Sequence, residues 1–289
     1  MTTIGWDKFR ILITNVCNYR CAFCHNEGQA KNDKLYMSID DFKKLVDFLQ
    51  HFTISEFTIS GGEPFLHPRI IDMLLYACNK LTCDISCATN LSQITDDDIA
   101  KLTNSRIKFN IQFPFIDKAR FKNSTGSGRL NTTLSNIHKM RVAGIKIGLN
   151  TVIQFADSSL IEEIILFAAE NHLPLKLLPQ IGNVYSSRYK DWVFPIIRKY
   201  AINERDKGTG AIRWEIIAHG NETSILYIDS PCFSRDIVTC RNFSELRIHP
   251  GLFIQSCILK PISDKLDFQK GEPYVINQLL QEWNNFKNC

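Results

Sequence analysis

The sequence has no apolar run of the roughly 18 residues that a membrane-spanning helix needs. It also has no block of consecutive Lys and Arg residues, and its formal net charge is only +4. A nucleic-acid-binding surface is therefore not expected. Residues 1–10 contain no apolar signal segment, which favours a cytoplasmic protein without a membrane partner.

A hydrophobic content of 44% over 289 residues predicts one large α/β core with a smaller appendage. Ten cysteines in a chain without a signal segment fit a reducing compartment better than a disulfide scaffold. The cysteines therefore call for an explanation in terms of metal binding or burial.

Three of these cysteines lie within one short stretch, at Cys17, Cys21 and Cys24. This spacing brings three thiolates round one tight loop or helical face, where they could hold three corners of a cubane and leave the fourth iron open. Structural zinc sites and cubanes that only carry electrons use four ligands, and the adjacent His25 is poorly placed as a fourth. Burial as three structural cysteines is the alternative.

Short apolar segments alternate with amphipathic ones along most of the chain. Strands are predicted at 9–14, 56–60, 83–89, 107–113, 145–153 and 175–179. Helices are predicted at 38–49, 68–80, 99–102, 130–143, 160–171 and 188–205. Ser38 should cap the first helix, and Gly144 should end the fourth. The alternation predicts an α/β protein with a parallel sheet, either a partial (β/α)6 barrel or a doubly wound sheet.

The pattern changes after about residue 210, where 212–218 and 223–229 are predicted to form a hairpin. We expect a barrel domain over residues 1–208 and a small β-hairpin and helix domain over residues 209–289.

A glycine-rich motif follows the second predicted strand, with the residues Gly61, Gly62, Glu63 and Pro64. The glycines would let a ligand approach the backbone and leave amides free to donate, and Glu63 offers a carboxylate to an ammonium group. The third predicted strand ends at Thr89 and Asn90. Ordinary turns are the alternative for both motifs.

The motif Cys-x3-Cys-x-Phe-Cys at 17–24 resembles the signature of the radical S-adenosylmethionine (SAM) superfamily. The resemblance implies a [4Fe-4S] cluster on the three cysteines, a partial (β/α)6 barrel and reductive cleavage of SAM to a 5′-deoxyadenosyl radical. It also implies that SAM is held by Gly61, Gly62, Glu63, Pro64, Thr89, Asn90 and Asn110. Leu91 stands where the superfamily usually has glycine after the Thr-Asn pair.

Segments 10–14, 65–68, 121–126 and 143–150 resemble one family in particular, the GTP 3′,8-cyclases of molybdenum-cofactor biosynthesis. In that family a C-terminal twitch-type extension carries a second [4Fe-4S] cluster on three cysteines. The resemblance implies such a cluster on Cys232, Cys240 and Cys257, although Phe243 replaces one family cysteine. A zinc site or unrelated thiols remain alternatives.

Several basic residues of the cyclases are missing. Thr58, Gly148 and Glu245 stand where the cyclases have arginine or lysine. A triphosphate needs such donors, which favours a smaller or less anionic substrate. Arg10 and Arg247 remain as candidates for substrate contact or as partners in structural salt bridges.

The sequence therefore predicts a radical SAM enzyme that abstracts hydrogen from a small polar substrate in natural-product or cofactor biosynthesis. It would use SAM, two [4Fe-4S] clusters and an electron donor such as flavodoxin or ferredoxin. A divergent GTP 3′,8-cyclase is the first alternative. A non-catalytic iron-sulfur or zinc protein is the second, and a nucleic-acid-modifying enzyme would need a basic module that the sequence lacks.

Overall fold

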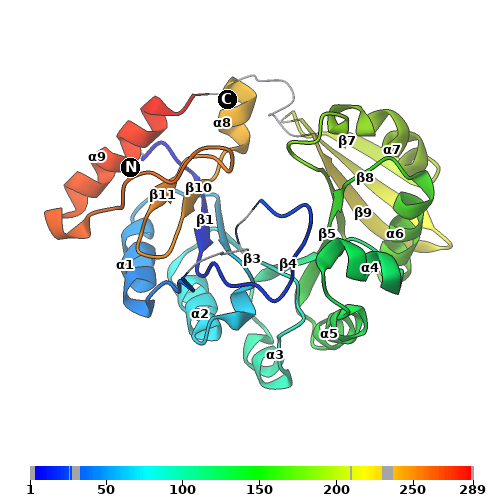
Figure 1. Cartoon of the computed structure of the whole chain (residues 1–289), viewed down its shortest axis with the longest axis horizontal. Coiled ribbons are helices and arrows are strands. Elements are labelled where there is room, and N and C mark those ends of the chain that lie inside the picture. Colours follow the sequence, from blue (N-terminus) through cyan, green and yellow to red (C-terminus); the bar gives the residue numbers. More distant parts are fainter. Residues whose placement is uncertain (1–3, 26, 28–32, 209, 230–236, 288–289) are drawn as a thin grey trace.

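The computed structural model describes residues 4–25, 27, 33–208, 210–229 and 237–287, and these form one curved sheet of eleven strands (Figure 1). Its strands are β1 (Lys8–Leu12), β2 (Glu56–Ser60), β3 (Asp84–Thr89), β4 (Lys108–Gln112), β5 (Lys146–Ile153), β6 (Leu175–Pro179), β7 (Ala201–Asp206), β8 (Ala211–Ala218), β9 (Asn221–Ile228), β10 (Leu246–Ile248) and β11 (Ile254–Gln255). The order across the sheet is β11-β10-β1-β2-β3-β4-β5-β6-β9-β8-β7. Because the sheet ends at β11 and β7, it is not closed.

Helices cover the outer face of this sheet (Figure 1). The α-helices are α1 (Ile39–Leu49), α2 (Ile70–Lys80), α3 (Asp96–Leu102), α4 (Lys118–Thr125), α5 (Leu130–Val142), α6 (Ser158–Glu170), α7 (Tyr189–Arg198), α8 (Ile237–Phe243) and α9 (Glu272–Asn285). Short 3-10 helices are η1 (Pro64–Leu66), η2 (Ser186–Arg188) and η4 (Phe268–Lys270). Within the described ranges, no helix combines the length and apolar character that crossing a membrane requires.

The strands β1 to β6 pair in parallel and in the order of the sequence. A doubly wound sheet reverses its strand order in the middle, and this sheet does not. The predicted α/β fold with a partial (β/α)6 barrel is therefore confirmed. The caps are confirmed too, because the Ser38 hydroxyl accepts from the Asp41 amide at 3.0 Å and Gly144 follows α5 with φ of +71°.

Strands from the C-terminal part extend both edges of this parallel core. The β8–β9 hairpin, predicted from the sequence, joins the sheet beside β6, and β10 pairs in parallel with β1. The predicted boundary at residue 208 falls in the turn between β7 and β8, which are antiparallel neighbours. The division into two domains stays a prediction.

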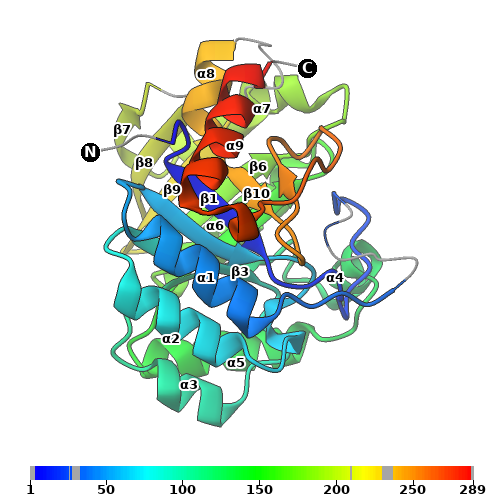
Figure 2. The same cartoon turned by 90° about the vertical axis from the view of Figure 1, so that its left-hand side faces the viewer.

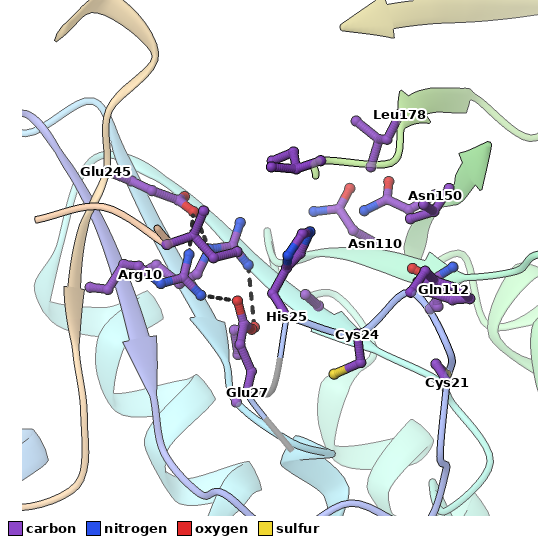
Figure 3. Close-up of a pocket in the computed structure, with 18 of the residues that line it drawn as sticks. Arg10, Cys21, Cys24, His25, Glu27, Asn110, Gln112, Asn150, Leu178 and Glu245 are labelled. Atoms are coloured by element: carbon purple, nitrogen blue, oxygen red, sulfur yellow. Dashed lines mark hydrogen bonds and ion pairs between the residues drawn. The ribbon is translucent and has the colours of Figure 1, made fainter. Parts of the chain in front are cut away.

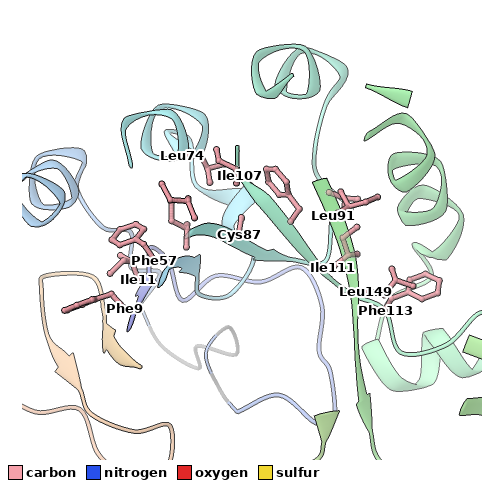
Figure 4. Packing of buried hydrophobic residues seen from close by; sticks show 14 of the residues in the cluster. Phe9, Ile11, Phe57, Leu74, Cys87, Leu91, Ile107, Ile111, Phe113 and Leu149 are labelled. Atoms are coloured by element: carbon pink, nitrogen blue, oxygen red, sulfur yellow. The ribbon is translucent and has the colours of Figure 1, made fainter. Parts of the chain in front are cut away.

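The hydrophobic core lies between the sheet and the outer helices (Figure 4). Phe9, Ile11 and Phe57 are completely buried there, together with Leu74 of α2. Because successive strand side chains point to opposite faces, Arg10 points to the inner side of the curve. The same alternation makes the inner side polar on several strands.

The sixth helix differs from its prediction. It was expected over 188–205, but α7 ends at Arg198 and Ala201–Asp206 forms β7. This segment is mostly exposed and has no strong pattern of its own, so its pairing with β8 decides its conformation. Helix α4 was not predicted, and α8 and α9 lie in the C-terminal part, where helix was expected without stated bounds. Asp117 caps α4 by accepting from the Arg120 amide at 2.8 Å.

Helix α9 packs beside the start of β1 (Figure 2). The Trp6 ring contacts the rings of Trp283 and Phe286 edge-on, at centroid distances of 4.9 and 5.4 Å. Leu279, on the same helix, is completely buried in the main core. The end of the described chain is thus part of the fold that holds β1.

Replacing Leu279 tests this packing. Leu279→Ala should lower the free energy of unfolding by about 2–5 kcal/mol, because a fully buried side chain leaves a cavity. Leu259→Ala is the matched control; Leu259 is 46% exposed, and its replacement should change the value by less than about 0.5 kcal/mol. Urea unfolding followed by circular dichroism measures both, and equal losses would contradict the packing of α9.

Candidate active site

A pocket of about 460 Å³ opens at the C-terminal ends of the parallel strands. It brings together most of the residues that the sequence analysis singled out, namely Arg10, Cys17, Cys21, Cys24, Gly61, Gly62, Glu63, Thr89, Asn90, Asn110, Cys240, Arg247 and Cys257. Pro64 begins η1 beside the pocket and is buried. Cys232 lies outside the described residues. Segments more than 200 residues apart in the sequence thus share one cavity.

The cysteine loop follows β1 and is fixed to the end of α4. The Arg20 amide donates to the Thr125 carbonyl at 2.7 Å, and the Ala22 amide donates to the Ser124 carbonyl at 3.2 Å. The Arg20 guanidinium donates to the Cys17 carbonyl at 3.0 Å and so closes the loop on itself. The helix that the sequence analysis missed is therefore one of the two supports of this loop.

The glycine motif is the other support. The Gly62 amide donates to the Thr14 carbonyl and the Glu63 amide to the Val16 carbonyl, both at 2.8 Å. A Cβ on Gly61 would lie 2.3 Å from the Thr14 oxygen, and one on Gly62 would lie 2.1 Å from the Val16 oxygen. The expectation that these amides are free for a ligand is wrong for Gly62 and Glu63. The glycines are required because the cysteine loop itself approaches so closely.

Glu63 is completely buried, and its carboxylate is engaged by the protein. It accepts hydrogen bonds from the Thr89 hydroxyl at 2.6 Å, the Asn90 amide at 2.7 Å and the Phe65 amide at 3.1 Å. Burial raises the pKa of Glu63 to about 7, against the lowering effect of these hydrogen bonds. The carboxylate therefore joins the ends of β2 and β3, and its predicted role as a partner for an ammonium group stays untested.

The Thr-Asn pair continues this network to the cysteine loop. The Asn90 side-chain amide donates to the Asn18 side-chain oxygen at 2.9 Å, and Asn18 in turn donates to the Ser92 hydroxyl at 2.8 Å. Leu91, where the superfamily usually has glycine, adopts φ of +60°. That left-handed conformation suits glycine better than leucine. The backbone at position 91 is thus one that glycine favours, although the residue is leucine.

A group of four charged residues forms one wall of the pocket (Figure 3). Glu245 accepts from Arg10 Nε and, at 3.3 Å, from Arg247 Nη1, while Arg247 Nη2 donates to Glu27. Burial and the neighbouring Arg10 lower the pKa of Arg247, although a guanidinium stays charged at neutral pH. Both arginines proposed for substrate contact are thus paired, and Glu27 is a pocket residue that was not predicted from the sequence.

Three amide side chains lie across the pocket from Arg10 and Glu245 (Figure 3). Asn110 and Gln112 project from β4, and Asn150 on β5 is the register partner of Gln112. Asn110 Oδ1, Gln112 Nε2 and Asn150 Oδ1 are buried and have no hydrogen-bond partner in the part of the chain that the structure describes. Buried polar atoms normally have partners, so this wall is suited to a ligand or to ordered water. Because side chains two residues apart on a strand point to the same face, Asn110 could have identified Gln112 as a pocket residue from the sequence.

The cysteines of the loop, Cys17, Cys21 and Cys24, are partly buried, and their thiols are close enough to affect one another electrostatically. Burial raises the pKa of Cys17 to about 11, and burial together with Cys17 and Cys24 raises that of Cys21 to about 12. A bound cluster would reverse this preference, because its irons favour thiolates. Among the residues described, no three His, Cys, Asp or Glu side chains converge enough to hold a single metal ion. A cubane attaches its thiolates to separate irons, so the donor set and the shared pocket fit a cluster.

The comparison with known families agrees with this donor set. Residues 11–167, more than half of the chain, match the profile of the Radical SAM superfamily. This chain belongs to that superfamily. The matched segment runs from β1 through α6 and includes the cysteine loop, the glycine motif and the Thr-Asn pair.

Curated relatives of this radical SAM protein include GTP 3′,8-cyclases. The chain is 28% identical over 269 residues to the GTP 3′,8-cyclase of Clostridium perfringens (strain 13 / Type A), which covers 87% of this chain and 80% of that protein. It is 24% identical over 268 residues to the probable GTP 3′,8-cyclase of Pyrococcus abyssi, covering 88% of this chain and 85% of that protein. The resemblance noted in the sequence thus extends over most of both chains.

Solved structures show the same fold. Streptococcus suis SuiB bound to S-adenosylmethionine aligns with a TM-score of 0.70 at 15% identity, covering 90% of this chain. This chain spans 63% of the SuiB chain. Native anSMEcpe with bound AdoMet aligns with a TM-score of 0.63 at 12% identity, covering 96% of this chain and 80% of that chain. At these identities the likeness concerns the fold alone.

Gly62→Ala tests the support of the radical SAM cysteine loop. The added Cβ meets backbone atoms of Val16 and Cys17, so the loop must shift, and the free energy of unfolding should fall by about 1–3 kcal/mol. Iron retained after anaerobic reconstitution should fall as well. Gly128→Ala is the control, because nothing lies within 4 Å of its added Cβ. Equal iron content in both variants would contradict the proposed contact.

The pH dependence of unfolding tests the state of Glu63. Its pKa is about 7 in the folded protein against 4.5 ordinarily, so the folded state holds a proton that the unfolded chain releases between these values. The free energy of unfolding of the metal-free protein should therefore fall by up to about 3 kcal/mol as pH rises from 4.5 to 7. Glu63→Gln should lose this contribution.

Glu204→Gln is the control for this experiment, because Glu204 forms an exposed pair with Arg198 and the pKa of Glu204 is lowered. Urea unfolding at pH 5 and pH 7.5 gives the comparison. The same pH dependence in wild type and Glu63→Gln would show that Glu63 does not carry it.

Proposed function

We propose that this protein is an enzyme that cleaves SAM reductively and uses the resulting radical to take a hydrogen atom from a small polar substrate. The observation that carries the proposal is the shared pocket. The cysteine loop, the glycine motif and the end of β3 form one hydrogen-bonded unit there, opposite a wall of polar groups. Superfamily membership supports the SAM chemistry.

The first cluster is proposed to bind Cys17, Cys21 and Cys24. When bound, such a cluster supplies an electron to SAM, whose cleavage gives methionine and the 5′-deoxyadenosyl radical. The protein's part is to keep the three thiols beside the pocket, through the bonds to α4 and to the glycine motif. A protein of the flavodoxin or ferredoxin class is proposed as the electron donor.

The SAM site is proposed next to this loop, at the ends of β2 to β4. It would comprise Gly61, Gly62, Glu63, Pro64, Thr89, Asn90 and Asn110. Asn110 is the most direct candidate for contact, because its side-chain oxygen is buried, faces the pocket and has no partner within the described residues. Glu63 and Asn90 act as positioning residues, since they fasten the cysteine loop to β2 and β3.

A second cluster is proposed on Cys240 and Cys257, which line the same pocket, with Cys232, which lies outside the described residues, as the third ligand. Arg247 is close enough to Cys257 for the thiol to affect the pKa of the guanidinium. A cluster there would face the substrate from the side opposite SAM. It could bind the substrate through an amine or hydroxyl or accept an electron from it, and a zinc site is the competing interpretation.

A divergent GTP 3′,8-cyclase is the second candidate function, and the names of the curated relatives favour it. The pocket weighs against it. Glu245 lines the pocket and introduces a negative charge where the cyclases have a positive one. Thr58, where the cyclases have arginine, supplies no charge; it is buried, forms a hydrogen bond with Ser86 at 3.0 Å and does not itself line the pocket. A ligand as anionic as a triphosphate would need positively charged donors at these positions. We therefore propose a substrate from natural-product or cofactor biosynthesis that is smaller or less anionic.

Formation of 5′-deoxyadenosine from SAM tests the proposed chemistry against a non-catalytic metal protein. Anaerobically reconstituted wild type should form it in the presence of dithionite. Cys17→Ala, Cys21→Ala and Cys24→Ala should each abolish formation, because three thiolates are needed to hold the cluster. Cys78→Ala should behave as wild type, since Cys78 does not line the pocket. Well-loaded wild type that forms no 5′-deoxyadenosine would refute the proposal.

Iron content tests the second cluster. Two cubanes require about eight irons per chain, and simultaneous replacement of Cys232, Cys240 and Cys257 by Ala should leave about four. Replacement of Cys78 by Ala should leave eight. Iron and acid-labile sulfide assays give the count. An unchanged count in the triple variant would show that these cysteines hold no cluster.

A further inference from the structure

We infer that the pocket accepts a substrate of low net charge, carrying hydroxyl, amide or amine groups, and that Glu245 excludes polyanions from it. The inference rests on the proposed function and deepens it by naming the class of substrate. It uses the described pocket residues alone and does not depend on how either cluster is bound.

The strand pairing explains why Glu245 lies where it does. Because β1 and β10 are parallel neighbours, Arg10 and Arg247 are register partners, and their guanidinium groups are brought to the same wall. Glu245 precedes Arg247 by two residues, so it projects to the same side. A single carboxylate oxygen, Glu245 Oε1, accepts from both arginines.

The second carboxylate completes the neutralisation of this wall. Glu27 accepts from Arg247 Nη2 and lies 3.5 Å from the Ser60 hydroxyl, which donates to it. The four side chains together carry two positive and two negative charges. The Arg247 side chain is only 4% exposed, whereas those of Glu27 and Glu245 are 21% and 27% exposed. The carboxylates are therefore more accessible to a ligand than the deepest cation is.

An anionic ligand at this wall would meet these carboxylates before it could pair with Arg247. Like charges in contact within a partly buried pocket repel strongly and disfavour the wrong partner. An anion would also have to displace existing ion pairs, which leaves a partly buried carboxylate without its partner. Glu245 is the more important of the two, because it contacts both arginines.

The opposite wall offers neutral hydrogen-bonding groups. Asn110, Gln112 and Asn150 carry buried amide atoms for which the described chain supplies no partner, and amides can donate to and accept from uncharged polar groups. Lys108 lies on β4 and Lys176 on β6, and neither lines the pocket. Among the described residues that line the pocket, both arginines are paired, and the remaining walls supply no lysine.

Titration with polyanions tests this inference. Inorganic tripolyphosphate and GTP are titrated calorimetrically into anaerobically reconstituted wild type, Glu245→Gln and Glu204→Gln at low and high salt. Wild type should show no saturable binding in the micromolar range. Glu245→Gln keeps the size of the side chain but removes the repulsion, and it should bind tripolyphosphate at least about tenfold more tightly, with weaker binding at high salt.

Glu204→Gln is the matched control, because it removes the carboxylate of an arginine pair outside the pocket and changes net charge equally. It should bind like wild type. An equal gain in both variants, no gain in Glu245→Gln, or micromolar binding of either polyanion to wild type would overturn the inference. If Glu245→Gln does not fold, the wild-type titration still decides between the outcomes. Formation of 5′-deoxyadenosine by wild type is measured separately, so failure of the proposed function is recognised independently.

Discussion

Two backbone hydrogen bonds, from the amides of Gly62 and Glu63 to the carbonyls of Thr14 and Val16, hold the cysteine loop against the end of β2. They can form only because neither Gly61 nor Gly62 carries a side chain at the point of contact. The Glu63 carboxylate accepts a hydrogen bond from the Asn90 amide at the end of β3, and the Asn90 side chain donates to Asn18 in the cysteine loop. The three motifs of the sequence are therefore one mechanical unit, and the position of the three thiols follows from it.

The part of the pocket that carries Arg10, Glu245 and Arg247 depends on the C-terminal segment packing against the N-terminal strand β1. Strand β10 pairs with β1 although about 235 residues separate Arg10 from Glu245, and α9 packs on Trp6. This packing brings Arg247, Cys240 and Cys257 to the pocket that the cysteine loop also lines. We propose that the local motifs serve radical formation and that the distant segments serve substrate binding in this one cavity. The paired charges of Arg10, Arg247, Glu27 and Glu245 support the proposal of a substrate less anionic than a triphosphate.

The sequence predicted most of what is locally encoded. The six parallel strands follow from short apolar runs, α1 from its Ser38 cap, and the cysteine loop from the spacing of three thiols. Features decided by distant contacts were not predictable. Residues 201–206 become a strand only because β8 lies beside them, and the pairing of Glu27 with Arg247 joins residues 220 positions apart. Leu91 shows a third case, because its left-handed backbone is set by the surrounding network rather than by its own preference.

We propose that Cys17, Cys21 and Cys24 would hold three irons of a cluster and leave the fourth to SAM. Electron paramagnetic resonance of the dithionite-reduced protein, recorded with and without SAM, tests it most directly, because the signal of a [4Fe-4S] cluster responds to a change in the ligands of its irons. SAM should shift the signal in a protein whose Cys240 and Cys257 are replaced by Ala, in which the first cluster alone contributes. A spectrum that is identical with and without SAM would contradict it.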